Sequence, residues 1–172
     1  MTRYALVPER SALTAQARSN VHPIHGEGRG LTGWVDVEVV DGRLDPASKP
    51  AVHIELDTDR LKAENSLYDR EIQKRINARR YPTIRGDVRE VRETAPGQFE
   101  VAGELSFNGA TKPVDGTAKV SVVDDRTLRV EGDLTVDIRD FGLEPPKILM
   151  LKVFPDVAVH VDLVAEREGT SG

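Results

Sequence analysis

The sequence predicts an all-β protein of about eight antiparallel strands with a single α-helix. Apolar and polar residues alternate along most of the 172-residue chain. Turn signals at Asp41-Gly42, Pro96-Gly97 and Asn108-Gly109 separate the alternating runs. Alternation alone does not distinguish an up-and-down barrel from a sandwich, because both folds bury one face of every strand.

The first half of the chain contains four alternating runs, at residues 4–7, 11–18, 35–39 and 52–57. Every second side chain in the longer runs is apolar, so each run has one face suited to a core and one suited to water. The first run ends at Pro8, which has no backbone N–H to donate to a neighbouring strand. These runs predict the first strands of the sheet.

One segment has a helical pattern in place of the alternating one. We predict a helix over about residues 66–80, which begins at the capping spacing Ser66-x-x-Asp69 and ends before Pro82. Its apolar side chains recur every four residues and therefore share one face. These side chains, which we expect to close one end of the β structure, are Tyr68, Ile72 and Ile76.

The second half of the chain resumes the alternation over residues 84–91, 99–107, 114–123, 128–138 and 157–163. The polar tail at about residues 167–172 is expected to be frayed. The sequence contains neither an internal repeat nor a linker. We therefore predict a single domain over residues 1–172.

One of these strands breaks the alternation. Ile84, Gly86 and Val88 share one face, but Val91 falls out of step with them. One extra residue near Arg89 restores the register, so we predict a β-bulge there. The apolar side chains on both sides of the bulge then lie on the same face of the strand.

Composition excludes several classes of protein. The chain has no cysteine, which excludes a disulfide framework and thiol chemistry. Its net charge of -5 argues against a broad nucleic-acid surface. No apolar run is long enough for a transmembrane span or a signal peptide, so we predict a cytoplasmic protein.

Residues that carry metal or catalytic chemistry do not form a recognised motif. The four histidines, His22, His25, His53 and His160, lack the spacing of a zinc site, and we interpret them as surface residues. The glycines of residues 26–30 lack the strand-to-helix context of a nucleotide site. We predict no enzymatic activity, no metal and no cofactor.

The apolar faces of the strands are the most informative feature. They either fill the interior with side chains or leave room for an apolar guest, and the pattern leaves both open. A polar ligand would need converging hydrogen-bonding groups on these faces. The residues expected to line the interior, besides the three apolar helix residues, are Val37, Ile54, Leu56, Phe99, Val101, Leu105, Phe107, Val120, Leu134, Val136, Ile138 and Phe141.

Two further segments have more than one interpretation. The basic residues of the predicted helix, Arg70, Lys74, Arg75 and Arg79, form either a solvated face or a contact for an anionic head group or membrane surface. The apolar run after Pro145-Pro146 is either buried core or a lip at which a guest enters or a partner docks, which leaves a homodimer open. The residues of this run are Ile148, Leu149, Met150 and Leu151.

Three segments in order resemble the YceI-like family of lipocalin-like polyisoprenoid-binding proteins. Residues 65–84 resemble its N-x-x-x-D helix that ends in Tyr-Pro. Residues 101–114 resemble its G-x-L-x-x-x-G-x-T-K-P-V hairpin, and residues 138–146 contain its Arg-Asp-Phe-Gly turn. The chain departs from the family pattern after His22, where residues 23–34 read PIHGEGRGLTGW.

The resemblance implies an antiparallel up-and-down lipocalin-like β-barrel of about eight strands, with one α-helix capping an end. It implies non-catalytic binding or carriage of an apolar chain in the lumen, such as a polyisoprenoid, an isoprenoid quinone or a fatty amphiphile. The alternative is a filled barrel without a ligand, which serves as a structural, protein-interaction or stress-related module.

Overall fold

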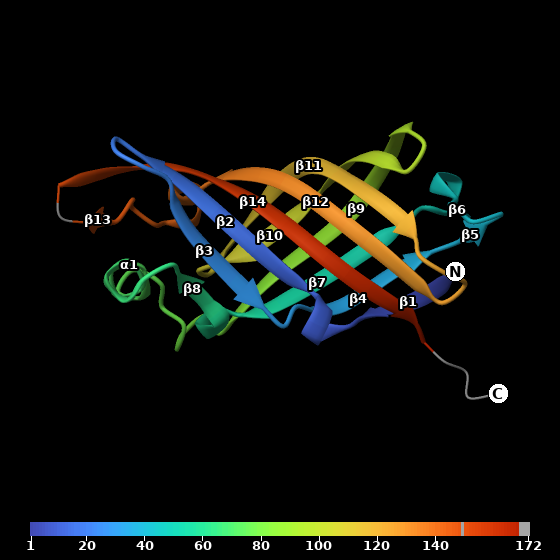
Figure 1. Ribbon diagram of the computed structural model, residues 1–172, viewed down its shortest axis with the longest axis horizontal. Coiled ribbons are helices and arrows are strands. Elements are labelled where there is room, and N and C mark those ends of the chain that lie inside the picture. Colours follow the sequence, from blue (N-terminus) through green and yellow to red (C-terminus); the bar gives the residue numbers. More distant parts are fainter. Residues whose placement is uncertain (149, 169–172) are drawn as a thin grey trace.

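The computed structural model describes residues 1–148 and 150–168 (Figure 1). Eight strands form a closed antiparallel ring, in which each strand pairs with the next and β14 pairs with β1. The predicted all-β barrel is therefore confirmed, and a sandwich is excluded. In ring order the strands are β1 (Thr2–Leu6), β4 (Thr32–Val37), β7 (Ala51–Asp57), β9 (Thr83–Ala95), β10 (Gln98–Phe107), β11 (Ala110–Val122), β12 (Thr127–Asp137) and β14 (Leu151–Arg167).

Three further strands extend the wall beyond the ring: β2 (Ala12–Ser19), β3 (Ile24–Arg29) and β8 (Leu61–Ala63). In the sheet they pair in the order β14, β2, β3, β8. The C-terminal residues of β14 pair with β1, and its earlier residues pair with β2. A 3-10 turn at Pro8–Arg10 separates β1 from β2 and lets the chain pass from the ring to this extension.

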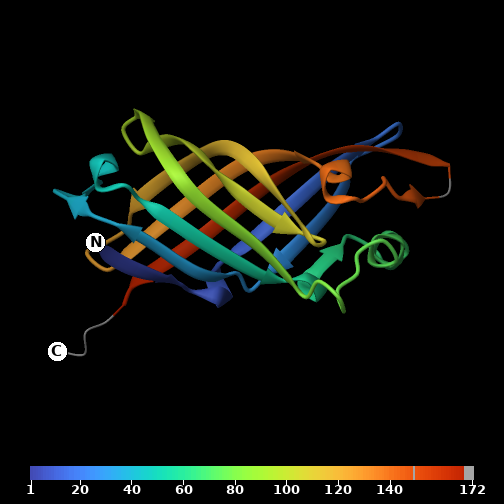
Figure 2. The ribbon, with the colours of Figure 1, turned by 180° about the vertical axis from the view of Figure 1, so that it is seen from behind.

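A short β-hairpin and the helix occupy opposite ends of the long axis (Figure 1). The hairpin of β5 (Val39–Val40) and β6 (Arg43–Leu44) lies at one end, and α1 (Ser66–Gln73) lies at the other beside β13 (Lys147–Ile148) (Figures 1 and 2). The predicted helix at one end of the barrel is therefore confirmed. No helix among the described residues has the length and apolar character needed to cross a bilayer.

The start of α1 differs from the prediction. Asn65 is the N-cap, and its side chain accepts a hydrogen bond of 2.9 Å from the Tyr68 N–H. Ser66 is the first helical residue. Asp69 accepts a hydrogen bond of 2.9 Å from the Ala63 N–H, so it ties the helix to β8 and does not cap the helix. Asparagine is an equally good N-cap because its side-chain oxygen reaches the free N–H groups of the first turn.

The predicted helix over residues 66–80 is too long, because α1 ends at Gln73. Asn77 begins a separate turn in which its side chain accepts a hydrogen bond of 3.2 Å from the Arg80 N–H. The Tyr81 N–H donates to the Asn77 carbonyl. An asparagine that bonds to nearby backbone in this way competes with helical hydrogen bonding.

The predicted bulge and turns are confirmed. The β9–β10 register shifts between Ala102 and Gly103, which leaves Arg89 unpaired. The turn at Asp41-Gly42 and the turn at residues 108–109 both have positive φ at their two central residues. This geometry suits the twist of a two-residue hairpin.

The end of the chain is more ordered than predicted. Arg167, which we expected in a frayed tail, belongs to β14 and pairs with Tyr4 of β1. Its N–H also donates to the Arg126 carbonyl at 2.6 Å. Arg167 is thus held by β1 on one side and by the residue that precedes β12 on the other. Residues 169–172 of the predicted tail lie outside the described residues.

Candidate functional site

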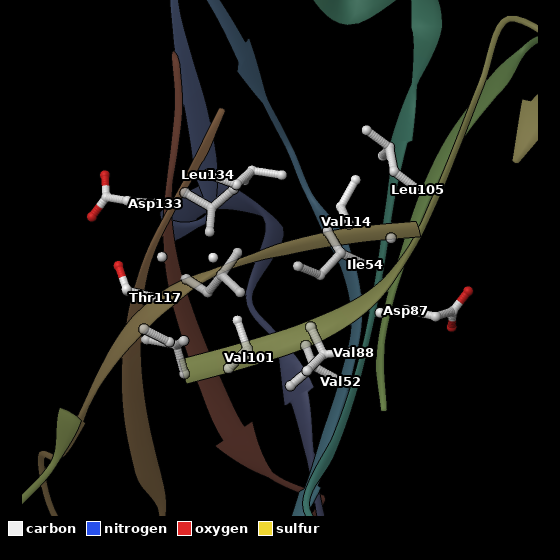
Figure 3. Close-up of a pocket in the computed structure, with 18 of the residues that line it drawn as sticks. Val52, Ile54, Asp87, Val88, Val101, Leu105, Val114, Thr117, Asp133 and Leu134 are labelled. Atoms are coloured by element: carbon white, nitrogen blue, oxygen red, sulfur yellow. The ribbon is translucent and has the colours of Figure 1, made fainter. Parts of the chain in front are cut away.

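A cavity of about 200 Å³ lies inside the barrel (Figure 3). Most of the side chains that enclose it come from the inward faces of the ring strands, and these are predominantly valine, leucine and isoleucine. One end of the interior is filled by a core of buried residues that includes Tyr4, Leu6, Leu128 and Ala165. The interior is therefore packed at one end and hollow further along.

Seven of the residues expected to line the interior do line this cavity. Leu105 and Ile54 face it from β10 and β7, and Leu134 faces it from β12 (Figure 3). Period-two alternation brings them together, because side chains at every second position lie on one face of a strand. The seven residues are Ile54, Leu56, Phe99, Val101, Leu105, Val120 and Leu134.

Other expected lining residues lie elsewhere. Val37 is fully buried in the packed core. Val136 and Phe141 line a separate surface recess. Phe107 packs edge-on against Phe141, with ring centroids 5.9 Å apart. Ile138 lies in the 3-10 helix η4 (Ile138–Phe141) that follows β12, and it does not border the cavity.

None of the predicted helix-face residues borders the cavity. Tyr68 packs against a second, small cluster of Ile24, Ile148 and Val153. Ile72 is half-buried within α1, and Ile76 lies beyond the end of the helix. The helix lies at the end of the barrel, and the second cluster lies under it, so its apolar face is used in local packing.

The four basic residues proposed as head-group contacts also lie away from the cavity lining. Lys74 and Arg75 form ion pairs of 3.0 Å and 3.3 Å with Glu71. Arg70 and Arg79 are exposed, and neither forms an ion pair among the described residues. Arg79 lies in the turn after α1, because the helix ends earlier than predicted. These side chains belong to the outer surface of the α1 end.

The apolar run that follows Pro145-Pro146 contains both buried and exposed residues. Ile148 is buried in the second cluster, and Leu151 packs against that cluster. Met150 is 93% exposed. Leu149 lies outside the described residues. The core interpretation therefore holds for Ile148, whereas Met150 stands on the surface.

The cavity wall also contains residues that the sequence argument did not select. Val52, Val88, Val159 and Val161 continue the alternation on strands already predicted, so the same signal could have identified them. Leu44 reaches the cavity from the short strand β6, where no run is long enough for an alternation signal.

The charged residues near the cavity point away from it. Asp87 and Asp133 project outward from the barrel wall in Figure 3. Asp87 Oδ1 lies 2.6 Å from His53 Nδ1, and Asp133 Oδ1 lies 2.7 Å from His160 Nδ1. These pairs lie on the outer face, as alternation predicted for the two histidines. No group of three metal-ligating side chains is found among the described residues.

The neighbours of His53 raise its pKa and so favour its charged form. Partial burial lowers its pKa, but the hydrogen bonds to Asp87 and Glu55 more than offset this, so the pKa lies above the usual 6.5. The Trp34 ring lies 5.0 Å from the His53 ring and shields one side of it. This cluster therefore stabilises the outer surface of β4, β7 and β9.

The barrel wall is split between β11 and β12. Their pairing stops at Thr117 and Asp133, although both strands continue past these residues. A surface recess lined by Val136 and Phe141 lies beside the split and shares Val114 with the cavity wall. A single layer of residues therefore separates the cavity from the surface at this position.

Comparison with known proteins places this barrel in a family. A family model described as the YceI-like domain matches residues 4–165. The chain is 28% identical over 127 residues to UPF0312 proteins of Vibrio cholerae, a match that covers 69% of this chain and 66% of theirs.

Solved structures share the fold at low sequence identity. Burkholderia cenocepacia BcnA superposes with a TM-score of 0.77 at 15% identity, over 93% of this chain and 99% of that one. A polyisoprenoid binding domain from Saccharophagus degradans superposes with a TM-score of 0.73 at 13% identity, over 98% and 100%. Because the family model spans nearly the whole sequence, the chain belongs to the YceI-like domain family.

Proposed function

We propose that the protein binds an apolar chain in its barrel cavity without catalysing a reaction on it. The observation that carries this proposal is the hollow part of the interior, whose lining is almost entirely apolar side chains. A packed barrel would have filled this space, since protein cores normally leave few voids larger than a water molecule. An empty apolar cavity costs stability, and a guest recovers that cost.

The class of guest follows from the lining. The charged residues labelled in Figure 3, Asp87 and Asp133, point away from the cavity, and the lining is predominantly apolar, so the enclosed part of the ligand needs no hydrogen-bonding partner. Each 100 Å² of chain surface removed from water contributes about 2.5 kcal/mol. A polyisoprenoid, an isoprenoid quinone or a fatty amphiphile has such a chain, and a relative of the same fold is described as a polyisoprenoid binding domain.

Two observations support binding rather than catalysis. Asp87 and Asp133 at the cavity wall are engaged by histidines on the outer face. The other two carboxylates of the wall, Glu104 and Asp115, are exposed. General acid–base chemistry on a guest would need such a group within hydrogen-bond reach of the guest. The cavity surface instead offers apolar side chains against which a guest can pack.

Extraction of purified protein with organic solvent, together with native mass spectrometry, tests the proposal. We expect a bound lipid from cells, or uptake of a polyprenol or a fatty acid by the delipidated protein. Bare polypeptide after incubation with all of these ligands would contradict the proposal. It would favour the alternative, a structural or interaction module with no guest.

A further inference from the structure

Three large apolar side chains are exposed at the α1 end of the barrel. Met150 is 93% exposed, Val21 is 68% exposed and Leu67 is 39% exposed. The β2–β3 turn and α1, which carry Val21 and Leu67, lie at the same end of the long axis as the start of β14, which Met150 directly precedes (Figures 1 and 2). We call these three side chains the apolar tip.

Hydrogen bonds hold the three parts of the apolar tip against one another. Next to Val21, the ring of His22 stacks on Tyr68 of α1, and its Nε2 lies 3.2 Å from the Tyr68 hydroxyl. On the other side, the Asn20 N–H donates to the Lys152 carbonyl at 3.0 Å, and the Lys152 N–H donates to Asn20 Oδ1 at 2.8 Å. The three segments that carry the apolar tip are therefore tied to one another.

The net charge of the segment around α1 is opposite in sign to the net charge of the whole protein. Residues 61–82 contain six basic and three acidic side chains, although the chain as a whole has a net charge of -5. Arg70 and Lys74 are exposed and lie three and seven residues after Leu67, so they share its helix face. Among the described residues Arg70 forms no ion pair, and Lys74 pairs with Glu71 at 3.0 Å.

We propose that the apolar tip and its basic surroundings dock the protein onto a bilayer that contains anionic lipids. Apolar side chains that flank basic residues on an amphipathic face are the pattern of an interfacial contact, in which the apolar groups enter the acyl boundary and the cations meet the head groups. The acidic remainder of the molecule is repelled by such a surface, so the field orients the α1 end toward it. This docking does not depend on what the cavity holds.

Liposome flotation tests the proposal with vesicles of phosphatidylcholine alone and with vesicles that also contain phosphatidylglycerol. We expect the full chain to float with the anionic vesicles at low salt and to be released as the salt concentration rises. The double variant Arg70→Glu with Lys74→Glu should bind at least about tenfold more weakly, because each cation near the surface contributes attraction. Met150→Asp and Val21→Asp should each weaken binding as well.

Matched controls come from the opposite end of the barrel. Val40 and Val123 are 55% and 59% exposed, so Val40→Asp and Val123→Asp make the same kind of replacement on exposed apolar side chains but should leave vesicle binding unchanged. The tip variants should keep the wild-type melting temperature, because the replaced side chains are exposed. Three results would each overturn the proposal: no flotation of the wild type, an equal loss in the controls, or a dimer that the tip variants dissociate without any vesicle binding.

Discussion

Gly86 of β9 lies directly opposite Leu105 of β10, and its missing side chain faces the cavity that Leu105 lines. A Cβ atom placed on Gly86 would have no atom within 4 Å apart from those of its chain neighbours. The position also faces Ile54 of β7 on its other side. One glycine therefore accounts for part of the space in the barrel, and a side chain there would occupy it.

The substitution Gly86→Leu should abolish ligand uptake without unfolding the protein. The leucine would fill the cavity, and loss of a strand glycine should stabilise the fold by about 0.5–1 kcal/mol. Uptake of a fluorescent fatty acid and the urea midpoint check the two effects separately. Gly86→Ala is the matched control, since a methyl group leaves most of the cavity open. Normal uptake by the leucine variant would show that the ligand does not occupy this part of the barrel.

The substitution Gly103→Ala should have the opposite effect on stability. A Cβ atom at Gly103 would collide with the main-chain carbonyl oxygen of Asp87 on the neighbouring strand, and backbone cannot move aside as a side chain can. We expect a loss of about 2–3 kcal/mol in the free energy of unfolding, measured by urea denaturation. Gly86→Ala again serves as the comparison, because it lies on the facing strand in open space. Equal midpoints for the two alanine variants would contradict this account.

The substitution Leu105→Arg should remove binding and lower stability together. It places a charge against the apolar cavity wall, where Asp87 and Asp133 point away from the cavity (Figure 3). We expect a loss of about 2–4 kcal/mol in the free energy of unfolding and no uptake of a polyprenol. Glu104→Arg adds the same side chain at the adjacent exposed position and should retain uptake.

The stability of the barrel should depend on pH through His53. Its pKa is raised in the fold, so the charged form is favoured there, and its contribution is fully present below the unfolded value of 6.5. That contribution is lost as the pH rises through the folded pKa. The stability difference between wild type and His53→Gln should therefore be larger at pH 5.5 than at pH 9, in urea titrations at both values.

A partner variant isolates the cause of the His53 shift. Asp87→Asn removes the carboxylate whose oxygen lies 2.6 Å from His53 Nδ1. An NMR titration of the imidazole protons should then show a lower pKa for His53 than in the wild type, because the remaining burial lowers it. An unchanged titration curve would mean that Asp87 does not raise the pKa of His53.

Alternation predicted the faces of the strands well because it is a local property. Side chains two residues apart on a strand lie on the same face whatever the strand packs against, so Ile54, Leu105 and Leu134 were expected to point inward. The bulge at Arg89 followed from the same reasoning, since one slipped residue moves the apolar set to the other face. These features require no knowledge of distant contacts.

Local sequence patterns did not predict where the helix ends or what its apolar face packs against. The apolar spacing of Tyr68, Ile72 and Ile76 suits a longer helix, but α1 ends at Gln73 and Asn77 begins a separate turn after it. The apolar face was expected to close the lumen. Tyr68 packs on Ile148 instead, because β13 and β14 bring that residue beneath α1.

The sequence by itself determined which side chains turn inward and where the chain turns, because both depend on residues a few positions apart. Only the tertiary structure decided that the interior is hollow around Gly86 and packed around Val37. That outcome depends on how side chains from eight strands, far apart in the chain, fill one shared volume. Period-two alternation is the same for a filled and for an empty barrel, so it does not indicate whether side chains fill that volume.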